Sequence, residues 1–290
     1  MTIFLHYLKR HAREPIGIAI YIIAPIVFLF FTTVINEAAF DAGIEAANEL
    51  PGVIGEVAGA AAEAVVNAFQ LEGGSLNTSI NAFMSMIMFQ LMGSLIVIDV
   101  LFRDLRKDMR WRLAAAPVKQ IKLVVGNFKG AFIFAMVSGL LIILFNVLLG
   151  GYMFTPWVVF ATLILVALMS QLLGVLMFFL FNRMAVANTV AVIFVWSMAL
   201  IQGLMFQVPL PDAVERFGQY HTPLAWAMRA IMSSGGTEAQ EVLGAFNVLG
   251  ISFAGEMSDT LRNMGFLAAF VAVLAVAVVI ASHIRGRKLS

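Results

Sequence analysis

The chain has 290 residues, of which 61% are hydrophobic and only 12% are charged, and its formal net charge is +1. Because soluble globular proteins carry about 25% charged residues, this composition leaves too little polar surface for an ordinary soluble domain. Cysteine is absent, which excludes disulfides, thiolate metal sites and cysteine nucleophiles.

The first predicted element is an amphipathic helix over residues 1–15. Its basic side chains lie away from an apolar and aromatic face that consists of Ile3, Phe4, Tyr7 and Leu8. This pattern is typical of a helix that lies along the inner leaflet of a membrane. Two roles stay open for this helix, a simple membrane anchor and a docking element for a partner protein.

Apolar stretches of membrane-spanning length follow along the chain. Each is long enough as an α-helix, at about 1.5 Å per residue, to cross roughly 30 Å of hydrocarbon. Because the backbone in lipid must satisfy its own hydrogen bonds, such stretches are expected to be helices. We therefore predict an all-α integral membrane protein that forms a single transmembrane domain over 1–290. The six predicted spans are 16–36, 80–101, 130–149, 156–181, 186–207 and 264–283.

The distribution of Lys and Arg predicts how these spans are oriented. The segments 1–15, 102–129, 182–185 and 284–290 hold 15 of the 18 basic residues. The positive-inside rule places such segments in the cytoplasm. We therefore expect a multi-pass protein of the plasma (inner) membrane with both termini cytoplasmic, which agrees with an even number of spans.

The two long loops 37–79 and 208–263 are then expected outside. Loop 37–79 carries seven acidic residues and no basic one, and several of its acidic side chains recur at helical spacing. We interpret it as two short amphipathic helices with a solvated acidic face, in preference to a surface that attracts cationic substrates. Loop 208–263 contains the apolar run 242–254, which is too short to span and predicts a re-entrant or interfacial segment.

Motifs of catalysis are missing from the chain. It has no phosphate-binding P-loop, no H-E-x-x-H zinc motif and no G-x-S-x-G nucleophile motif, so we expect no catalytic residue, no metal site and no cofactor of its own. Asp99 lies one turn before Arg103, and a local pairing explains it. The other polar residues of interest either line a substrate pathway or hold helices together. They are Gln90, Ser94, Asn188, Ser197 and Gln202.

Two loop motifs carry the strongest functional signal. The cytoplasmic loop places a charged helix over 103–113, with Pro117 after it and Gly126 leading into the next helix. The outer loop places prolines directly after the fifth span, then a Pro-Leu-x-aromatic segment that ends near an arginine. This outer pattern consists of Pro209, Pro211, Pro223, Trp226 and Arg229. In the order and spacing of these motifs, the chain resembles permeases of the type-2 ABC exporter family over essentially its whole length.

This resemblance implies a machine of several subunits. Two permeases, identical or different, would assemble with two separate ATPase subunits that bind ATP and magnesium. The helix 103–113 would be the coupling helix, seated in a groove of the ATPase and braced by the N-terminal helix. The second and fifth spans would line the pathway, and 208–263 would form its outer gate. The coupling residues would be Arg103, Asp104, Arg106, Lys107, Arg110, Trp111, Leu113 and Pro117.

The function expected from the resemblance is export of an amphiphilic substrate, namely a drug-like molecule, a lipid or a peptide. ATP hydrolysis in the partner ATPase would power it, so the chain itself would be no enzyme. The expected partners are this ABC ATPase, a second permease as homodimer or heterodimer, the lipid bilayer and the small-molecule substrate, with no nucleic acid. Two alternatives stay open: a secondary transporter or channel that needs no ATP, and a membrane sensor subunit.

Overall fold

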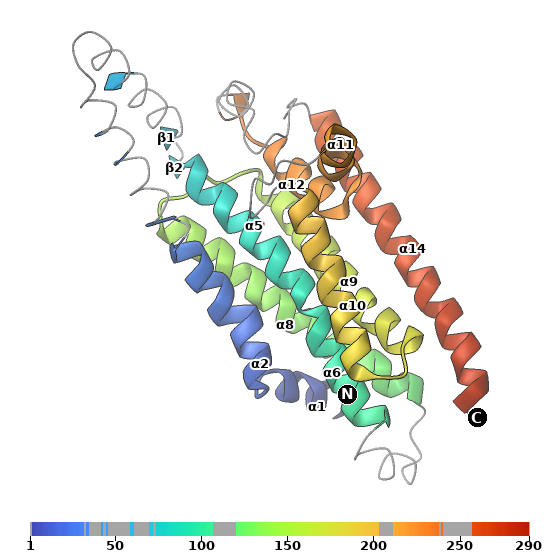
Figure 1. The fold of residues 1–290 in the computed structure, drawn as a ribbon. Coiled ribbons are helices and arrows are strands. Elements are labelled where there is room, and N and C mark those ends of the chain that lie inside the picture. The colour runs from blue at the N-terminus through green and yellow to red at the C-terminus, as the bar shows by residue number, and fades with distance from the viewer. Residues whose placement is uncertain are drawn as a thin grey trace.

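The computed structural model shows a bundle of long helices (Figure 1). It describes residues 2–31, 33–34, 42, 45, 59–60, 70–71, 74–106, 120–202, 211–237, 239 and 257–289. The N-terminal helices are α1 (Thr2–His11), α2 (Pro15–Ile18) and the π-helical turn η1 (Ala19–Ile23). The helices that follow are α5 (Leu76–Met92), α6 (Ser94–Arg106), α8 (Gln120–Leu148), α9 (Pro156–Leu180), α10 (Met184–Ile201), α11 (Asp212–His221), α12 (Pro223–Met232) and α14 (Met257–Leu289). Strands β1 (Gln70–Leu71) and β2 (Gly74–Ser75) pair as a minimal antiparallel hairpin.

Five helical stretches within the described residues are long and apolar enough to cross a membrane. They are Leu76–Leu105, Ile121–Leu148, Pro156–Leu180, Met184–Ile201 and Met257–Arg285. These match the second to sixth predicted spans, so the helical, multi-pass class is confirmed. The first predicted span, 16–36, corresponds to the shorter apolar helix Ala19–Phe31. The six-span count therefore stays a prediction.

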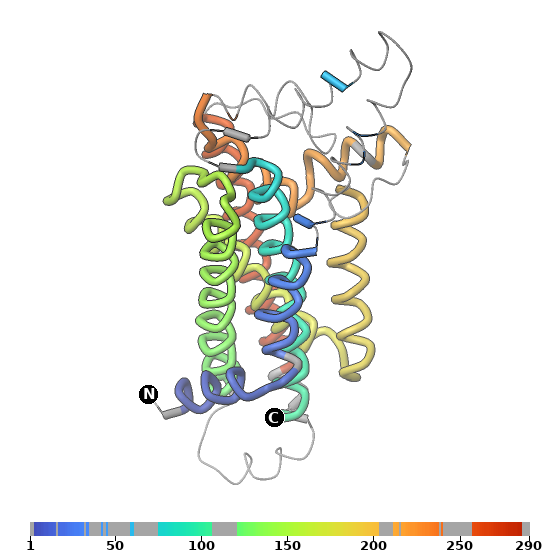
Figure 2. The backbone as a smooth tube through the Cα atoms, turned by 90° about the vertical axis from the view of Figure 1, so that its left-hand side faces the viewer, coloured from blue at the N-terminus to red at the C-terminus, as the bar shows by residue number. Residues whose placement is uncertain are grey.

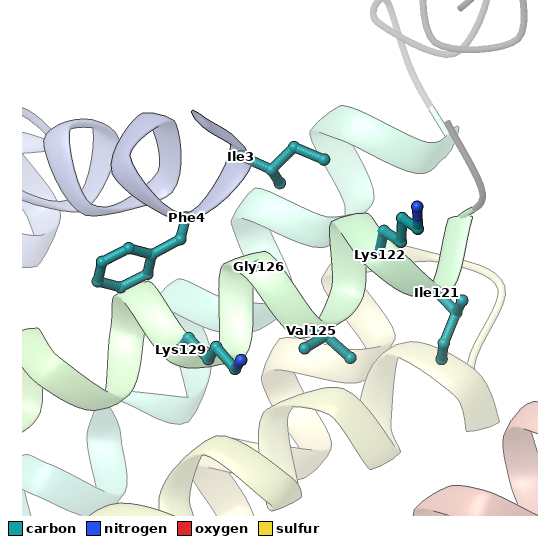
Figure 3. A pocket seen from close by; sticks show the side chains of 7 residues that line it. All are labelled: Ile3, Phe4, Ile121, Lys122, Val125, Gly126 and Lys129. Atoms are coloured by element: carbon teal, nitrogen blue, oxygen red, sulfur yellow. The ribbon is translucent and has the colours of Figure 1, made fainter. Parts of the chain in front are cut away.

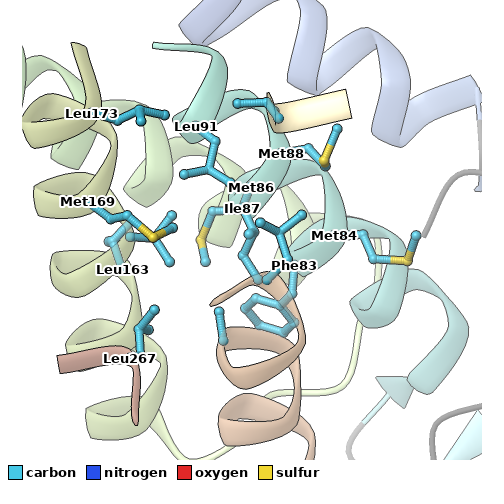
Figure 4. Packing of buried hydrophobic residues seen from close by; sticks show 14 of the residues in the cluster. Phe83, Met84, Met86, Ile87, Met88, Leu91, Leu163, Met169, Leu173 and Leu267 are labelled. Carbon is cyan, nitrogen blue, oxygen red and sulfur yellow. The ribbon is translucent and has the colours of Figure 1, made fainter. Parts of the chain in front are cut away.

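Burial divides these helices into a central and a peripheral set. In α5 and α6 together, 78% of the apolar window is buried, against 22% in α10 and 17% in α14. Figure 4 shows Leu91 of α5 facing Met169 and Leu173 of α9 in this core. Helix α9 packs against α5, α6, α8, α10 and α14 and so joins the bundle. Figure 2 shows α10 standing at one side of it. The peripheral helices therefore leave much apolar surface for lipid or for another protein chain.

Helix α8 begins at Gln120, ahead of the predicted start at residue 130. The small and polar residues of its first turns pack against α1, so they continue the helix instead of forming a loop. Gly126 and Asn127 are buried, whereas Lys122 and Lys129 are exposed. Hydropathy alone marks the edge of the hydrocarbon core, and this helix extends past that edge.

Helices α5 and α6 meet at Gly93, whose backbone angles stay helical (φ −57°, ψ −21°), so the break between them is confined to this residue of the stretch Leu76–Leu105. A Cβ atom added at Gly93 would lie 1.8 Å from the hydroxyl oxygen of Tyr21, whose side chain is fully buried. That hydroxyl accepts a hydrogen bond of 3.0 Å from Nε2 of Gln171 on α9. Tyr21 belongs to η1, and π-helical turns of this kind are common at functional positions in helices. Gly93 is therefore required for the close approach of the first and second helical stretches.

Gly93→Ala should destabilise the protein by about 1–3 kcal/mol, because the added methyl group overlaps the buried Tyr21 ring. The expected result is a clear fall in the melting temperature of the purified protein in detergent. Gly265→Ala on α14 is the matched control, since no heavy atom lies within 4 Å of the added Cβ there. Alanine favours helix over glycine, so this control should melt at the same or a higher temperature. Equal melting of Gly93→Ala and wild type would contradict the Tyr21 contact.

Candidate functional site

Helix α1 is packed onto the rest of the protein. It crosses the foot of α8, as Figure 2 shows, at two glycines one turn apart. A Cβ atom at Gly126 would lie 2.7 Å from Cγ2 of Ile3, and one at Gly130 would lie 3.1 Å from the backbone nitrogen of Leu8. Glycines at four-residue spacing let two helix backbones approach closely. The apolar face predicted for this helix therefore packs against α8 of the same chain.

The buried carboxylate of Asp104 ties α1 to the end of α6. Tyr7 donates a hydrogen bond of 2.8 Å to Oδ2 of Asp104, and Arg10 donates to Oδ1 and forms an ion pair with it. Both Tyr7 and Asp104 are only 2% exposed. A buried carboxylate is costly unless it is paired and hydrogen-bonded, and here both oxygens have donors. We name this arrangement the α1–α6 junction (Tyr7, Arg10, Asp104).

Burial and the nearby Asp104 charge raise the pKa of Tyr7 above its usual value of 10. Both effects disfavour the phenolate, because a second negative charge would face the carboxylate. Tyr7 therefore stays a hydrogen-bond donor throughout the neutral range. The junction holds without any change in the protonation of its tyrosine.

A second group of charges extends the contact between the N-terminal segment and α6. Arg103 pairs with Asp99 at 2.7 Å and with Glu14 at 3.1 Å. The predicted Asp99–Arg103 pairing is thus confirmed, and Glu14 was not foreseen. Arg103 is 43% exposed on its side chain, so each of these pairs contributes little by itself. Their effect is to orient Arg103 toward the N-terminal segment.

His11 provides a third link, this time between α1 and α8. Its Nε2 atom shares a hydrogen bond of 2.8 Å with Oδ1 of Asn127, and both residues are buried. Burial lowers the pKa of His11 below its usual value of 6.5, and the neighbouring Arg10 charge acts in the same direction. The neutral imidazole is therefore the form that fits this site at physiological pH.

The structure describes only the beginning of the predicted coupling helix. Arg103, Asp104 and Arg106 lie in the last turns of α6. The other coupling residues lie outside the described residues: Lys107, Arg110, Trp111, Leu113 and Pro117. Sequence reasoning missed Tyr7, Arg10 and His11 as partners of this region. The available signal was Asp104 itself, an acidic residue within a strongly basic segment.

The polar residues proposed to line a pathway have different surroundings. The side-chain amide of Gln90 donates to the backbone carbonyl of Ala135 on α8 at 3.2 Å. The backbone carbonyl of Gln90 accepts from the Ser170 hydroxyl on α9 at 2.5 Å. Gln90 and Ser94 are fully buried in the bundle, so they take part in contacts between helices. Asn188 and Ser197 are half-buried on α10, and Gln202 is buried at its end. The structure therefore gathers Gln90 and Ser94 near the break at Gly93, apart from the α10 residues.

Helices α11 and α12, which hold the described members of the predicted outer gate, lie at the end of the bundle opposite α1 (Figure 1). Pro223 opens the buried helix α12, where the Thr222 hydroxyl accepts from the backbone N–H of Ala225. The Trp226 indole donates to the carbonyl of Tyr220 at 2.8 Å and packs beside Phe266 of α14. Pro211 precedes α11 and is exposed. Pro209 and the run 242–254 lie outside the described residues.

Arg229 is the unusual member of the predicted outer gate. It is 7% exposed, and its guanidinium carbon lies 3.8 Å above the centre of the Tyr220 ring. This cation–π contact offsets part of the cost of burying the charge. Its Nε and Nη2 atoms have no acceptor among the described residues. The end of the bundle at α12 thus holds a buried cation beside an aromatic ring.

Comparison with known proteins gives one family. The model of a family described as ABC-2 family transporter protein matches residues 31–280, which is most of the chain. No curated protein shows significant similarity to the chain.

Tyr7→Phe should loosen α1, because it leaves a buried carboxylate oxygen of Asp104 without its donor. A hydrogen bond to a charged group contributes about 1.5–3 kcal/mol, so a lower melting temperature and faster tryptic cleavage within residues 9–13 are expected. Leu5→Gln is the control, since Leu5 is exposed on the same helix and the substitution leaves every trypsin site in place. Proteolysis of Tyr7→Phe at the rate of wild type would show that the hydrogen bond does not hold α1.

The stability of the protein should fall as the pH drops through about 6.5, because the unfolded state then binds a proton that buried His11 resists. The folded pKa is the lower one, so this stability is present above 6.5 and is lost below it. His11→Gln should weaken the dependence of the melting temperature between pH 7.5 and 5.5. His283→Gln, at an exposed residue of α14, should keep it. A dependence that is unchanged in His11→Gln would rule out His11 as its source.

Proposed function

Because the chain belongs to the ABC-2 transporter family, a family of membrane permeases that lack an ATPase domain, we propose that it is the permease subunit of an ATP-driven exporter. ATP and magnesium would bind on a separate ATPase subunit. The substrate would be amphiphilic, namely a drug-like molecule, a lipid or a peptide. The protein would lie in the plasma (inner) membrane, with both termini and the α1 end of the bundle in the cytoplasm.

The observation that carries this proposal is the α1–α6 junction. Asp104 lies at the start of the coupling segment 103–113, where an ATPase would push in this family. Through Tyr7 and Arg10, the same carboxylate holds α1 across the foot of α8. A displacement of the coupling segment would therefore move α1, α6 and α8 together instead of bending a loose loop.

The proposed path of the force runs along α6. This helix connects the junction directly to the break at Gly93, with no loop between them. A rigid helix transmits displacement, and a break between two helices lets one segment tilt against the other. At the break lie Gln90 and Ser94, whose Oε1 and Oγ atoms have no partner among the described residues. Tilting of α6 would offer these polar groups to the pathway.

A second permease subunit would cover the peripheral helices. Helix α10 buries a stripe of small and branched residues against its own bundle, while Val186, Ile193 and Leu200 on the other face are exposed. We place the exposed face of α10 toward the second subunit, so that Asn188 and Ser197 border the pathway. The outer gate would consist of the α11–α12 region, with Trp226 and Arg229 near the exit.

The experiment is reconstitution of the tagged chain with the ATPase that co-purifies with it. Asp104→Asn should insert into the membrane normally but lose about tenfold or more of ATP-dependent transport of a fluorescent amphiphile, since a charged hydrogen-bond partner of about 1.5–3 kcal/mol is lost. Trp111→Asp should abolish substrate-stimulated ATP hydrolysis. The matched control is Asp259→Asn, which breaks the Asp259–Arg262 pair of 2.7 Å at the start of α14 and should keep transport.

Two results would contradict the proposal. One is the failure of any ATPase to co-purify with the chain. The other is transport in liposomes driven by a proton gradient without ATP, which would favour a secondary transporter instead. Retained substrate-stimulated hydrolysis in Trp111→Asp would count against the coupling role of 103–113 specifically.

A further inference from the structure

A pocket of about 270 Å³ lies between α1 and the first turns of α8. Figure 3 shows Ile3 and Phe4 of α1 on one side of it and Ile121 and Val125 of α8 on the other. Gly126 lies between them and leaves its part of the wall without a side chain. The pocket is therefore an apolar groove formed by the docking of α1, and it is separate from the α1–α6 junction.

Two lysines flank this groove. Lys122 and Lys129 line its two ends on α8, as Figure 3 shows, and both are exposed. The ion pairs of the described residues involve Arg10, Arg103 and Arg262, so neither lysine has a carboxylate partner there. The two lysines lie seven residues apart on the helix, or about 10 Å along its axis. Their long, flexible side chains can therefore both reach one anionic headgroup. The groove thus favours a ligand with a negative head and an apolar body.

The apolar wall of the groove continues along α8 toward the membrane centre. Ile121 and Val125 are exposed by 54% and 43%, and exposed apolar side chains recur beyond them at helical spacing. These are Ile133, Val137, Leu140 and Leu144. A single stripe therefore leads from the lysines into the hydrocarbon. An acyl chain that lay on this stripe would have its headgroup at the lysines.

The level of the groove along the membrane normal fits that of phospholipid headgroups. Helix α8 has 29 residues, or about 43 Å, so its ends extend beyond a hydrocarbon core of roughly 30 Å. The amphipathic α1, which lies across α8 at Gly126 and Gly130, marks the level of the interface. Lysines at this level extend toward the headgroups, where an anionic lipid attracts them.

We propose that the α1–α8 groove binds one acidic phospholipid of the inner leaflet. Its phosphate and anionic headgroup lie between Lys122 and Lys129, and one acyl chain follows Val125 and the stripe below it. The lipid packs against Phe4 and so joins α1 to α8 at a second place, beside the junction at Asp104. The proposal does not depend on ATP-driven transport, because it concerns only this chain and the bilayer.

The test is lipid binding to the purified full chain, measured by native mass spectrometry with phosphatidylglycerol and phosphatidylcholine as probes. Wild type should bind phosphatidylglycerol more tightly than phosphatidylcholine. The double variant Lys122→Gln/Lys129→Gln should bind phosphatidylglycerol about 30-fold more weakly, since each lysine near an anionic surface contributes about fivefold. The control Lys9→Gln/Arg183→Gln removes the same charge from two exposed residues outside the groove and should keep the preference.

A further variant tests the apolar part of the site. Val125→Trp should fill the groove while both lysines stay, and it should lower phosphatidylglycerol binding without changing the net charge. Equal binding by the double lysine variant and wild type would overturn the proposal, as would an equal loss in the control pair. Loss of ATPase co-purification without any loss of lipid binding in the double variant would also overturn it and assign the groove to a protein partner.

Discussion

The pairing of one buried carboxylate determines how the α1 end of this bundle is built. Asp104 is nearly inaccessible to water, and such a charge stays in place only because Tyr7 and Arg10 donate to both of its oxygens. Those two donors belong to α1, so the requirement for pairing places α1 across α8 and against α6. The glycines at 126 and 130 make this placement sterically possible.

The same end of the molecule is joined to the interior through a single helix. Helix α6 runs from Asp104 to the break at Gly93, where the buried Tyr21 ring occupies the space that a side chain would need. In the proposed exporter, α6 would thus transmit a displacement of the α1–α6 junction to Gly93. The polar groups of Gln90 and Ser94 lie near Gly93.

The distribution of buried surface shows what a single chain leaves incomplete. Helices α5 and α6 are mostly enclosed, whereas only 22% of the apolar window of α10 and 17% of that of α14 are buried. Lipid covers such surfaces as well as protein does, so exposure alone does not demand a partner. The half-buried Ser197, which lies on the same face of α10 as Ile193 and Leu200, is what favours a second subunit along this face. The α1–α8 groove differs in kind, because its two lysines select for a negative headgroup.

The sequence by itself determined the membrane class, five of the spanning helices and the amphipathic face of α1, because hydropathy and helical spacing are local properties. It also determined the Asp99–Arg103 pair, whose residues lie one helical turn apart. Tertiary structure alone decided the Tyr7–Asp104 bond, since its residues are 97 positions apart, and the need for glycine at position 93, since Tyr21 comes from another helix. The early start of α8 has the same origin: its first polar turns are stable as helix because α1 packs against them.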